Sequence, residues 1–209
     1  MSYNTSISPL DDRYKEKTQI VKKFFSELAF FRFRVLVEVS YFIELLNLNL
    51  KQFYIENKTD LVNDLISIYK NFNLNDYQKI KEYEKKINHD VKAIEYFLRD
   101  KFSVIGIEKF NSFIHFGLTS QDVNNTALSF SLKTFIYEQY IPKLNFITDK
   151  ILDDKINIWE GVIMLSRTHG QPAVPTSFGK ELKVFNYRLY LQTEILTNIK
   201  FYGKLGGAS

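Results

Sequence analysis

The pattern of apolar and polar positions is helical along most of the chain. Glycine and proline are scarce before Gly161, and apolar residues recur three or four positions apart. Between Thr59 and Phe72 this spacing predicts a short amphipathic helix with Thr59 or Asp60 as its cap. The pattern therefore predicts an all-α body.

A second helix is predicted to begin at Asn75 or Asp76, and the short polar break Asn88–Asp90 separates it from a third. The apolar positions expected to face inward are Tyr77, Ile80, Tyr83 and Ile87 before the break, and Val91, Ile94, Phe97 and Leu98 after it. His89 is thus expected near a helix N-terminus.

A capping box marks the next helix, because Thr119 is followed three residues later by Asp122. This helix is predicted to run to about Gln139. Pro142 suits the first turn of a further helix, which is predicted to continue to about Trp159.

After Gly161 the apolar run Val162–Leu165 is too short for a helix and predicts a buried extended segment. It leads into "LSRTHGQPAVP", Leu165–Pro175, a loop that holds one histidine, one glycine and two prolines.

A heptad seam follows the loop, with one polar member. Its positions are Phe178, Leu182, Phe185, Leu189, Gln192, Leu196 and Ile199. Spacing alone favours equally an intramolecular bundle and helices shared between subunits.

Composition limits the class of protein. The chain has 209 residues, of which 45% are hydrophobic and 16% aromatic, and this composition predicts a folded, globular protein. The absence of cysteine excludes a disulfide framework, a Cys-ligated metal and a thiol nucleophile, and it favours a cytoplasmic location.

Neither a membrane nor a nucleic acid is indicated as a partner. The first residues lack the apolar core of a signal peptide. The most apolar stretch, Phe24–Leu48, is interrupted by Glu27, Arg32, Arg34, Glu38 and Glu44. The net charge of +4 arises from lysines that mostly stand beside acids, which favours a mixed solvated face over a phosphate-binding stripe.

Two of the three histidines are candidates for chemistry. His89 and His169 lie at boundaries between elements beside small or polar residues, where a ring can face a cleft. His115 lies in the more apolar "SFIHFGL", which favours a structural role. Neither metal-ligand spacing nor a phosphate-binding glycine pattern occurs, so no metal site is predicted.

Two polar motifs suit anions. Thr119 and Ser120 bring hydroxyl and N–H groups to a helix start, where a carboxylate can bind, although an ordinary cap is the simpler interpretation. Arg13 and Tyr14 in "DDRY" could recognise a phosphate, or simply form a surface turn. Together the motifs suggest acid–base chemistry on a polyanionic metabolite.

Four motifs in this order carry a family resemblance: "SPLDDRY", "NHDVKAIEYFL", "FIHFGLTSQDVNN" and "LSRTHGQPAVPTSFGKE". The chain resembles the adenylosuccinate lyase family of the fumarase/aspartase superfamily along essentially its whole length. Gly170 and Gln171 after Thr168 and His169 favour this branch, because fumarases and argininosuccinate lyases typically place Leu-Gln there.

The resemblance implies an N-terminal helical domain, residues 1–117, and the start of a central helical bundle, residues 118–209. It implies a cytoplasmic homotetramer of purine biosynthesis that eliminates fumarate from adenylosuccinate, giving AMP, and from the succinyl-carboxamide ribotide. Neither reaction uses a metal or an organic cofactor.

The resemblance also assigns roles to residues. His169 is implied as the general acid and His89 as a substrate-contacting histidine that assists it. The other implied substrate-binding residues are Thr119 and Ser120 for the succinyl carboxylate, Asn88 and Asp90 for the nucleotide, Arg13 and Tyr14 for its phosphate, and Thr168 and Gln171 beside the acid.

One departure from the family affects function. The family's general base is a serine in an "SSxMPxKxNP"-type loop, and these 209 residues hold no such segment. We therefore expect a truncated piece that is inactive alone. The alternatives are a sister fumarate-releasing lyase, a non-catalytic helical oligomerisation module and a helical nucleic-acid-binding domain.

Overall fold

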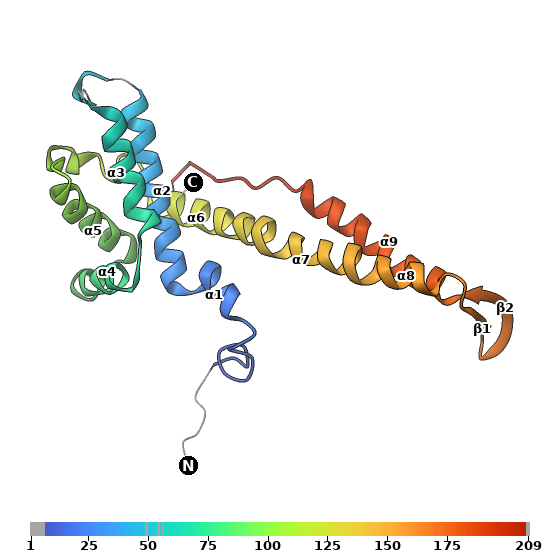
Figure 1. Cartoon of the computed structure of the whole chain (residues 1–209). Coiled ribbons are helices and arrows are strands. Elements are labelled where there is room, and N and C mark those ends of the chain that lie inside the picture. The colour runs from blue at the N-terminus through green and yellow to red at the C-terminus, as the bar shows by residue number, and fades with distance from the viewer. Residues whose placement is uncertain (1–6, 49, 54, 56, 208–209) are drawn as a thin grey trace, which may run out of the picture. The chain divides into compact units, whose positions relative to one another are not determined.

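The structure is a computed structural model that describes residues 7–48, 50–53, 55 and 57–207. The chain divides into two compact units, Met1–Leu132 with Tyr202–Ser209, and Lys133–Phe201. Helices dominate both units, and the β-structure of the described residues is one two-stranded hairpin (Figure 1). The all-α fold class is thus confirmed, while the domain boundary between residues 117 and 118 stays a prediction.

Unit 1 is built around one long helix, α2, with shorter helices packed on it. Its elements are α1 Gln19–Phe25, α2 Glu27–Asn47, η1 Lys51–Phe53, α3 Lys58–Lys70, α4 Leu74–Ile87, α5 Asp90–Val104, η2 Glu108–Phe113 and the first turns of α6 Ser120–Phe135. Helices α3, α4 and α5 all contact α2, and α4 packs along α5 (Figure 1).

The core of unit 1 is rich in aromatic rings. Phe42 of α2 lies 4.8 Å from Phe102 and 6.0 Å from Phe110 between ring centroids. Each fully buried side chain of this kind stabilises the fold by roughly 1.5–3 kcal/mol. The buried positions Ile80, Val91, Ile94, Phe97 and Leu98, and the partly buried Tyr77, Tyr83 and Ile87, confirm the predicted inward faces of α4 and α5.

The predicted caps of two helices were wrong by two or three residues. Helix α3 follows Asn57 instead of Thr59 or Asp60. Helix α4 follows Asn73, which forms a capping box with Asp76. The Asn73 side chain accepts the Asn75 N–H at 2.9 Å, and the Asp76 carboxylate accepts the Asn73 N–H at 3.2 Å. The spacing of the apolar residues does not indicate which of several neighbouring polar residues caps the helix.

Unit 2 consists of helical segments followed by the hairpin and one long helix. After the end of α6 it contains the π-helical segments η3 Ile136–Tyr140 and η4 Phe146–Leu152, with α7 Ile141–Asn145, α8 Asp153–Trp159, β1 Ile163–Thr168, β2 Gln171–Ser177 and α9 Phe178–Thr197. Pro142 lies in the first turn of α7, as predicted.

Helices α8 and α9 approach each other closely at Gly179. A Cβ atom at this glycine would lie 2.6 Å from the carbonyl oxygen of Ile156 and 2.7 Å from the backbone nitrogen of Glu160. At the neighbouring positions, the rings of Trp159 and Phe178 pack with centroids 5.0 Å apart. The contact therefore requires a residue without a side chain at position 179.

The segment Val162–Leu165 is extended, as predicted, but the prediction that it is buried was wrong. Ile163 is 80% exposed and Leu165 48%. These side chains stand on a two-stranded hairpin, and within the described part of unit 2 no second layer covers it. The seam of α9 is also partly open, with Phe178 and Phe185 exposed and Ile199 beyond the end of the helix.

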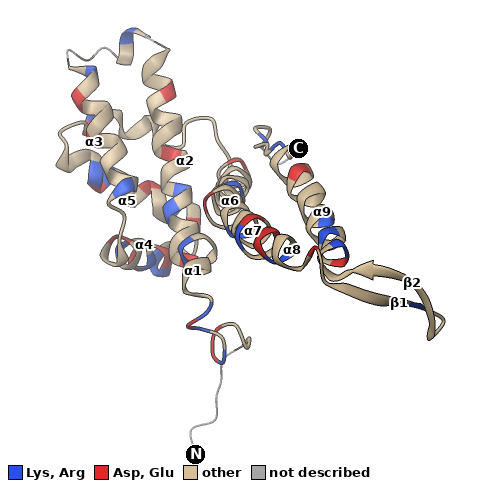
Figure 2. Ribbon diagram, turned by 45° about the vertical axis from the view of Figure 1, so that its right-hand side comes forward, with Lys and Arg blue, Asp and Glu red and all other residues tan. Residues whose placement is uncertain are grey.

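Charges of both signs are interspersed on the helices, as on α4, whereas the hairpin carries only Arg167 (Figure 2). No helix in the described ranges is both long and apolar enough to span a membrane.

Candidate active site

The break between α4 and α5 has a defined backbone geometry. Asn88 adopts the left-handed conformation with φ 51°, and its N–H donates to the Glu84 carbonyl at 2.7 Å. Asparagine tolerates this conformation better than most residues, so it can end α4 without a glycine. The chain then becomes extended at His89, which takes the N-cap position of α5.

His89 is oriented by its own helix. Its Nδ1 accepts the backbone N–H of Lys92 at 3.1 Å, so that nitrogen carries no proton and the neutral ring holds its proton on Nε2. The side chain is 52% exposed. The ring is thus held on one edge and can donate a hydrogen bond from the other.

Asp90 forms an ion pair with Arg34, a buried residue of α2, at 2.8 Å. The guanidinium of Arg34 also stacks on the ring of Phe30, with 4.0 Å to the centroid. Burial lowers the pKa of Arg34, and the charge of Asp90 opposes that shift. Asp90 therefore anchors the Asn88–Asp90 turn to α2.

His115, whose side chain is 14% exposed, pairs with the buried Glu38. Its Nδ1 lies 2.5 Å from Oε1 of Glu38, a residue only 2% exposed. Desolvation works to lower the pKa of His115, but the hydrogen bond and charge of Glu38 outweigh it and raise the pKa above its ordinary value. This contact supports the structural role expected for His115.

The start of α6 has a variant of the expected capping box. Asp122 accepts the backbone N–H of Thr119 at 2.8 Å, as predicted. The Thr119 hydroxyl also donates to Asp122, at 3.0 Å, instead of accepting a helix N–H. Ser120 is the first residue of the helix, and among the described residues its hydroxyl has no hydrogen-bond partner.

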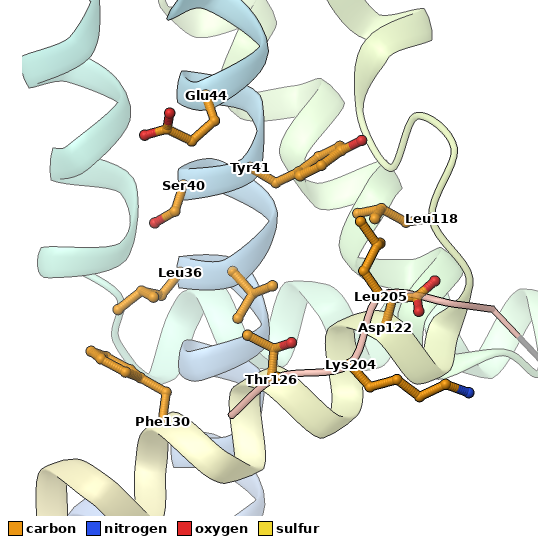
Figure 3. A pocket seen from close by; sticks show the side chains of 12 residues that line it. Leu36, Ser40, Tyr41, Glu44, Leu118, Asp122, Thr126, Phe130, Lys204 and Leu205 are labelled. Carbon is orange, nitrogen blue, oxygen red and sulfur yellow. The ribbon is translucent and has the colours of Figure 1, made fainter. Parts of the chain in front are cut away.

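A glycine-rich segment, Gly203–Gly207, lies against the same end of α6. Asn125 donates to the Lys204 carbonyl at 2.9 Å and accepts the Lys204 N–H at 2.6 Å. A largely apolar cavity of about 380 Å³ lies beside this segment. Figure 3 shows its lining side chains from α2 and α6, among them Tyr41 and Asp122.

Arg13 and Tyr14 lie in the turn that precedes α1, in unit 1. The Arg13 guanidinium is 5.4 Å from the centroid of the Tyr14 ring, and both side chains are exposed. Their role in binding a phosphate stays a prediction.

The hairpin of unit 2 presents His169 at its tip. His169 and Gly170 have φ values of 51° and 75°, which is the signature of a two-residue type I′ turn. Thr168 and Gln171 pair across the ends of the strands. The structure therefore brings Thr168, His169 and Gln171 together in unit 2, whereas the other predicted site residues belong to unit 1.

The sequence did not identify several residues that support the site. Arg34 and Glu38 stand four positions apart in an apolar stretch, where their charges argue against a membrane helix. That spacing places both on one face of α2, which is the available signal for a buried polar cluster. Asn125 and its contact with Lys204 carried no such signal.

No cluster of potential metal ligands occurs among the residues described.

Comparison with known sequences places the chain among lyases. A family model described as "Lyase" matches residues 12–209. The chain is 44% identical to the adenylosuccinate lyase of Dictyostelium discoideum, over 98% of this chain and 45% of that protein. It is 36% identical to the adenylosuccinate lyase of Escherichia coli (strain K12), over 100% of this chain and 46% of that protein. The chain thus spans a little under half the length of these curated relatives.

Solved structures share the fold. The fumarate lyase from Mesorhizobium sp. BNC1 matches with a TM-score of 0.70 at 18% identity, over 91% of this chain and 43% of that one. The β-carboxy-cis,cis-muconate cycloisomerase from Acinetobacter calcoaceticus sp. ADP1 matches with a TM-score of 0.64, also at 18% identity, over 91% and 43%. At such identities the likeness concerns the fold alone, and it agrees with the fumarase/aspartase-type architecture that was predicted.

Proposed function

We propose that this chain, which belongs to the lyase family, carries substrate-binding and acid-catalytic residues of an adenylosuccinate lyase. The enzyme would eliminate fumarate from adenylosuccinate to give AMP, and from the succinyl-carboxamide ribotide of purine biosynthesis. The similarity to curated adenylosuccinate lyases along nearly the whole chain is the observation that carries this proposal.

The reaction sets three chemical requirements. A base removes the proton β to the leaving nitrogen, negative charge then builds on the adjacent carboxylate, and an acid protonates the nitrogen as it departs. Donors for the carboxylate and a group that exchanges protons near neutral pH are therefore needed.

His169 is the residue that we assign as the acid. An imidazole exchanges its proton near neutral pH, which suits general acid catalysis. The type I′ turn fixes its backbone, so little conformational freedom remains to be lost when a substrate binds. Thr168 and Gln171, paired beside it, would contact the same substrate.

His89 is assigned a supporting catalytic role. Its Nδ1 is occupied by the Lys92 N–H, so Nε2 is the atom that can donate to the substrate. Asn88 and Asp90 would position the nucleotide from the same turn. The ion pair between the Asp90 carboxylate and Arg34 would hold this turn in place against α2.

The anionic parts of the substrate require donors at two places. Ser120 at the start of α6 would hold a succinyl carboxylate, where the helix dipole favours negative charge. Thr119, whose N–H and hydroxyl both donate to Asp122, would fix the end of the helix beside it. Arg13 and Tyr14 would bind the phosphate. Their stacked arrangement presents a guanidinium and a phenol on the same turn.

The proposal includes a cytoplasmic homotetramer that uses neither metal nor organic cofactor. The partly open seam of α9 supports packing against helices of other subunits, because an exposed apolar stripe favours association. The serine base implied by the resemblance is not among these 209 residues, so the chain alone should not turn over adenylosuccinate.

A chimera tests the function. This chain replaces the matching segment of the Dictyostelium discoideum adenylosuccinate lyase, and the loss of succinyl-purine absorbance is followed. We expect fumarate release from adenylosuccinate, and a decrease in kcat of about 10²–10⁴-fold in His169→Asn. Asparagine also tolerates positive φ, so this variant removes the imidazole and keeps the turn.

Two results would count against the proposal. One is an assembled chimera, with the oligomeric state of the relative, that shows no turnover. The other is a His169→Asn variant that retains the parental kcat.

A further inference from the structure

Asp122 is a buried carboxylate that joins two distant parts of unit 1. It is 4% exposed and accepts four hydrogen bonds. Oδ2 accepts the N–H and hydroxyl of Thr119, at 2.8 and 3.0 Å. Oδ1 accepts the N–H groups of Gly206 and Gly207, at 2.9 and 3.0 Å. One side chain thus satisfies donors from the start of α6 and from the glycine-rich segment.

The glycine-rich segment is fixed at two further points. Asn125, one turn along α6 from Asp122, pairs in both directions with the backbone of Lys204 (Figure 3 shows Lys204 beside α6). A Cβ atom on Gly203 would lie 2.7 Å from Oγ1 of Thr126, so the backbone approaches α6 as closely as a glycine allows. These contacts fix the register of the segment against the helix.

Helix capping does not account for this arrangement. A capping box uses a single carboxylate to accept the N–H of the N-cap residue, which Oδ2 already does. The bonds from Gly206 and Gly207 to Oδ1 add nothing to the cap. The N–H groups of Gly206, Thr119 and Gly207 hold the pKa of Asp122 well below its usual range, so the carboxylate remains an acceptor for both segments at neutral pH.

We propose that Asp122 is a positioning residue that fastens the Gly206–Gly207 turn to Thr119 and thereby fixes the anion-binding donors at Ser120. This inference rests on the proposed function, in which the start of α6 holds a substrate carboxylate. The Thr119 hydroxyl has one proton and donates it to Asp122, so this hydroxyl cannot also donate to a ligand. Thr119 therefore fastens the start of α6 to Asp122. Ser120, whose hydroxyl has no partner among the described residues, donates to the ligand.

The anchoring is tested on the 209-residue chain with Asp122→Asn. The amide replaces one acceptor oxygen with an NH₂ donor, which must then face either Thr119 or the two glycines. We expect amide hydrogen exchange at Gly206 and Gly207 to become at least about tenfold faster, as expected when their acceptor is lost. Asp64→Asn, at an exposed site on α3, is the matched control.

Core amides such as those of Val39 and Ile94 report on the fold as a whole. They should exchange at the parental rate in both variants, because they lie in α2 and α5. Unchanged exchange at Gly206 and Gly207 in Asp122→Asn would overturn the proposal, whatever the chain catalyses.

The positioning role is tested in the chimera described above. Asp122→Asn should lower kcat/KM by about 100-fold, the scale expected for a small misplacement of a binding group. KM should rise, whereas a purely structural defect would lower the amount of active enzyme and leave KM unchanged. Asp64→Asn should leave both constants at the parental values.

The outcomes separate the two proposals. An active chimera in which Asp122→Asn keeps the parental kcat and KM would overturn the positioning role and leave the proposed function standing. A parental chimera that assembles but is inactive would refute the proposed function and with it the role in substrate binding, and amide exchange would then decide the anchoring alone.

Discussion

The buried pair of Glu38 and His115 gives a stability prediction that the structure quantifies. His115→Ala removes the cationic partner of Glu38, a residue that is only 2% exposed in the parental structure. Its second oxygen, Oε2, already has no hydrogen-bond partner among the described residues. Removing one member of a buried ion pair costs about 3–5 kcal/mol, because the remaining charge is uncompensated. We expect a loss of that size in the free energy of unfolding of unit 1.

Two further variants separate the charge from the hydrogen bond. His115 has φ 59°, a conformation that asparagine also tolerates, and the Asn Nδ2 lies about where the His Nδ1 does. His115→Asn should therefore retain a donor to Glu38 and cost only about 1–2 kcal/mol, the scale of a weakened hydrogen bond. Glu38→Gln in the His115→Ala background should recover part of the lost stability, because it removes the buried charge.

The pair also predicts a pH dependence. The pKa of His115 is raised in the folded protein above its ordinary value of 6.5. Its contribution is fully present below that value and is lost as the pH rises through the raised, folded-state pKa. The parental chain should thus lose stability as the pH increases above about 6.5, and His115→Asn should lack this component.

The assay must follow unit 1 separately. The single tryptophan, Trp159, belongs to unit 2, so its fluorescence during urea unfolding reports on that unit. Native-state hydrogen exchange at the buried amides of Val35 and Val39 reports on unit 1. A loss within about 0.5 kcal/mol for His115→Ala, as at an ordinary surface site, would refute the reasoning.

Two other substitutions test the packing described above. Gly179→Ala should destabilise unit 2 by more than about 1 kcal/mol, because its Cβ would lie 2.6 Å from the Ile156 carbonyl oxygen. Helix propensity alone predicts a gain in stability of about that size. A higher midpoint of urea unfolding by Trp159 fluorescence would therefore contradict the clash. Arg34→Met retains an apolar side chain over Phe30 but removes the ion pair with the half-exposed Asp90. It should cost about 1–3 kcal/mol by hydrogen exchange in unit 1, and an unchanged value would show that the ion pair does not stabilise the turn.

The fold could be predicted wherever the apolar pattern is regular. Val91, Ile94 and Phe97 recur at helical spacing, and all three are buried on one face of α5. A helix that buries one face has this signature whatever it packs against. The break at Asn88–Asp90 was visible for the same reason, because it interrupts the pattern.

Contacts between distant residues could not be predicted in this way. The ion pair of Arg34 with Asp90 and the bonds of Asp122 to Gly206 depend on how separate elements pack, which local spacing does not encode. The exposure of Ile163 was missed because an apolar run indicates burial only if a second layer is present. The choice of Asn73 as a cap depended on side-chain hydrogen bonds that several neighbouring polar residues could have made.

The backbone conformation of the histidines is a stronger indication of function than their small number in the sequence. Among the described residues, the non-glycine residues with positive φ are Asn88, His115 and His169. This conformation costs roughly 1–2 kcal/mol for an ordinary L-residue, so the backbone alone would favour glycine or asparagine at both positions. At position 115 the buried contact with Glu38 offsets the cost. At position 169 no described contact does so, and the imidazole at the turn beside Gly170 is exposed. Strain that packing does not explain is typical of functional positions, which makes the hairpin tip the strongest candidate for chemistry in unit 2.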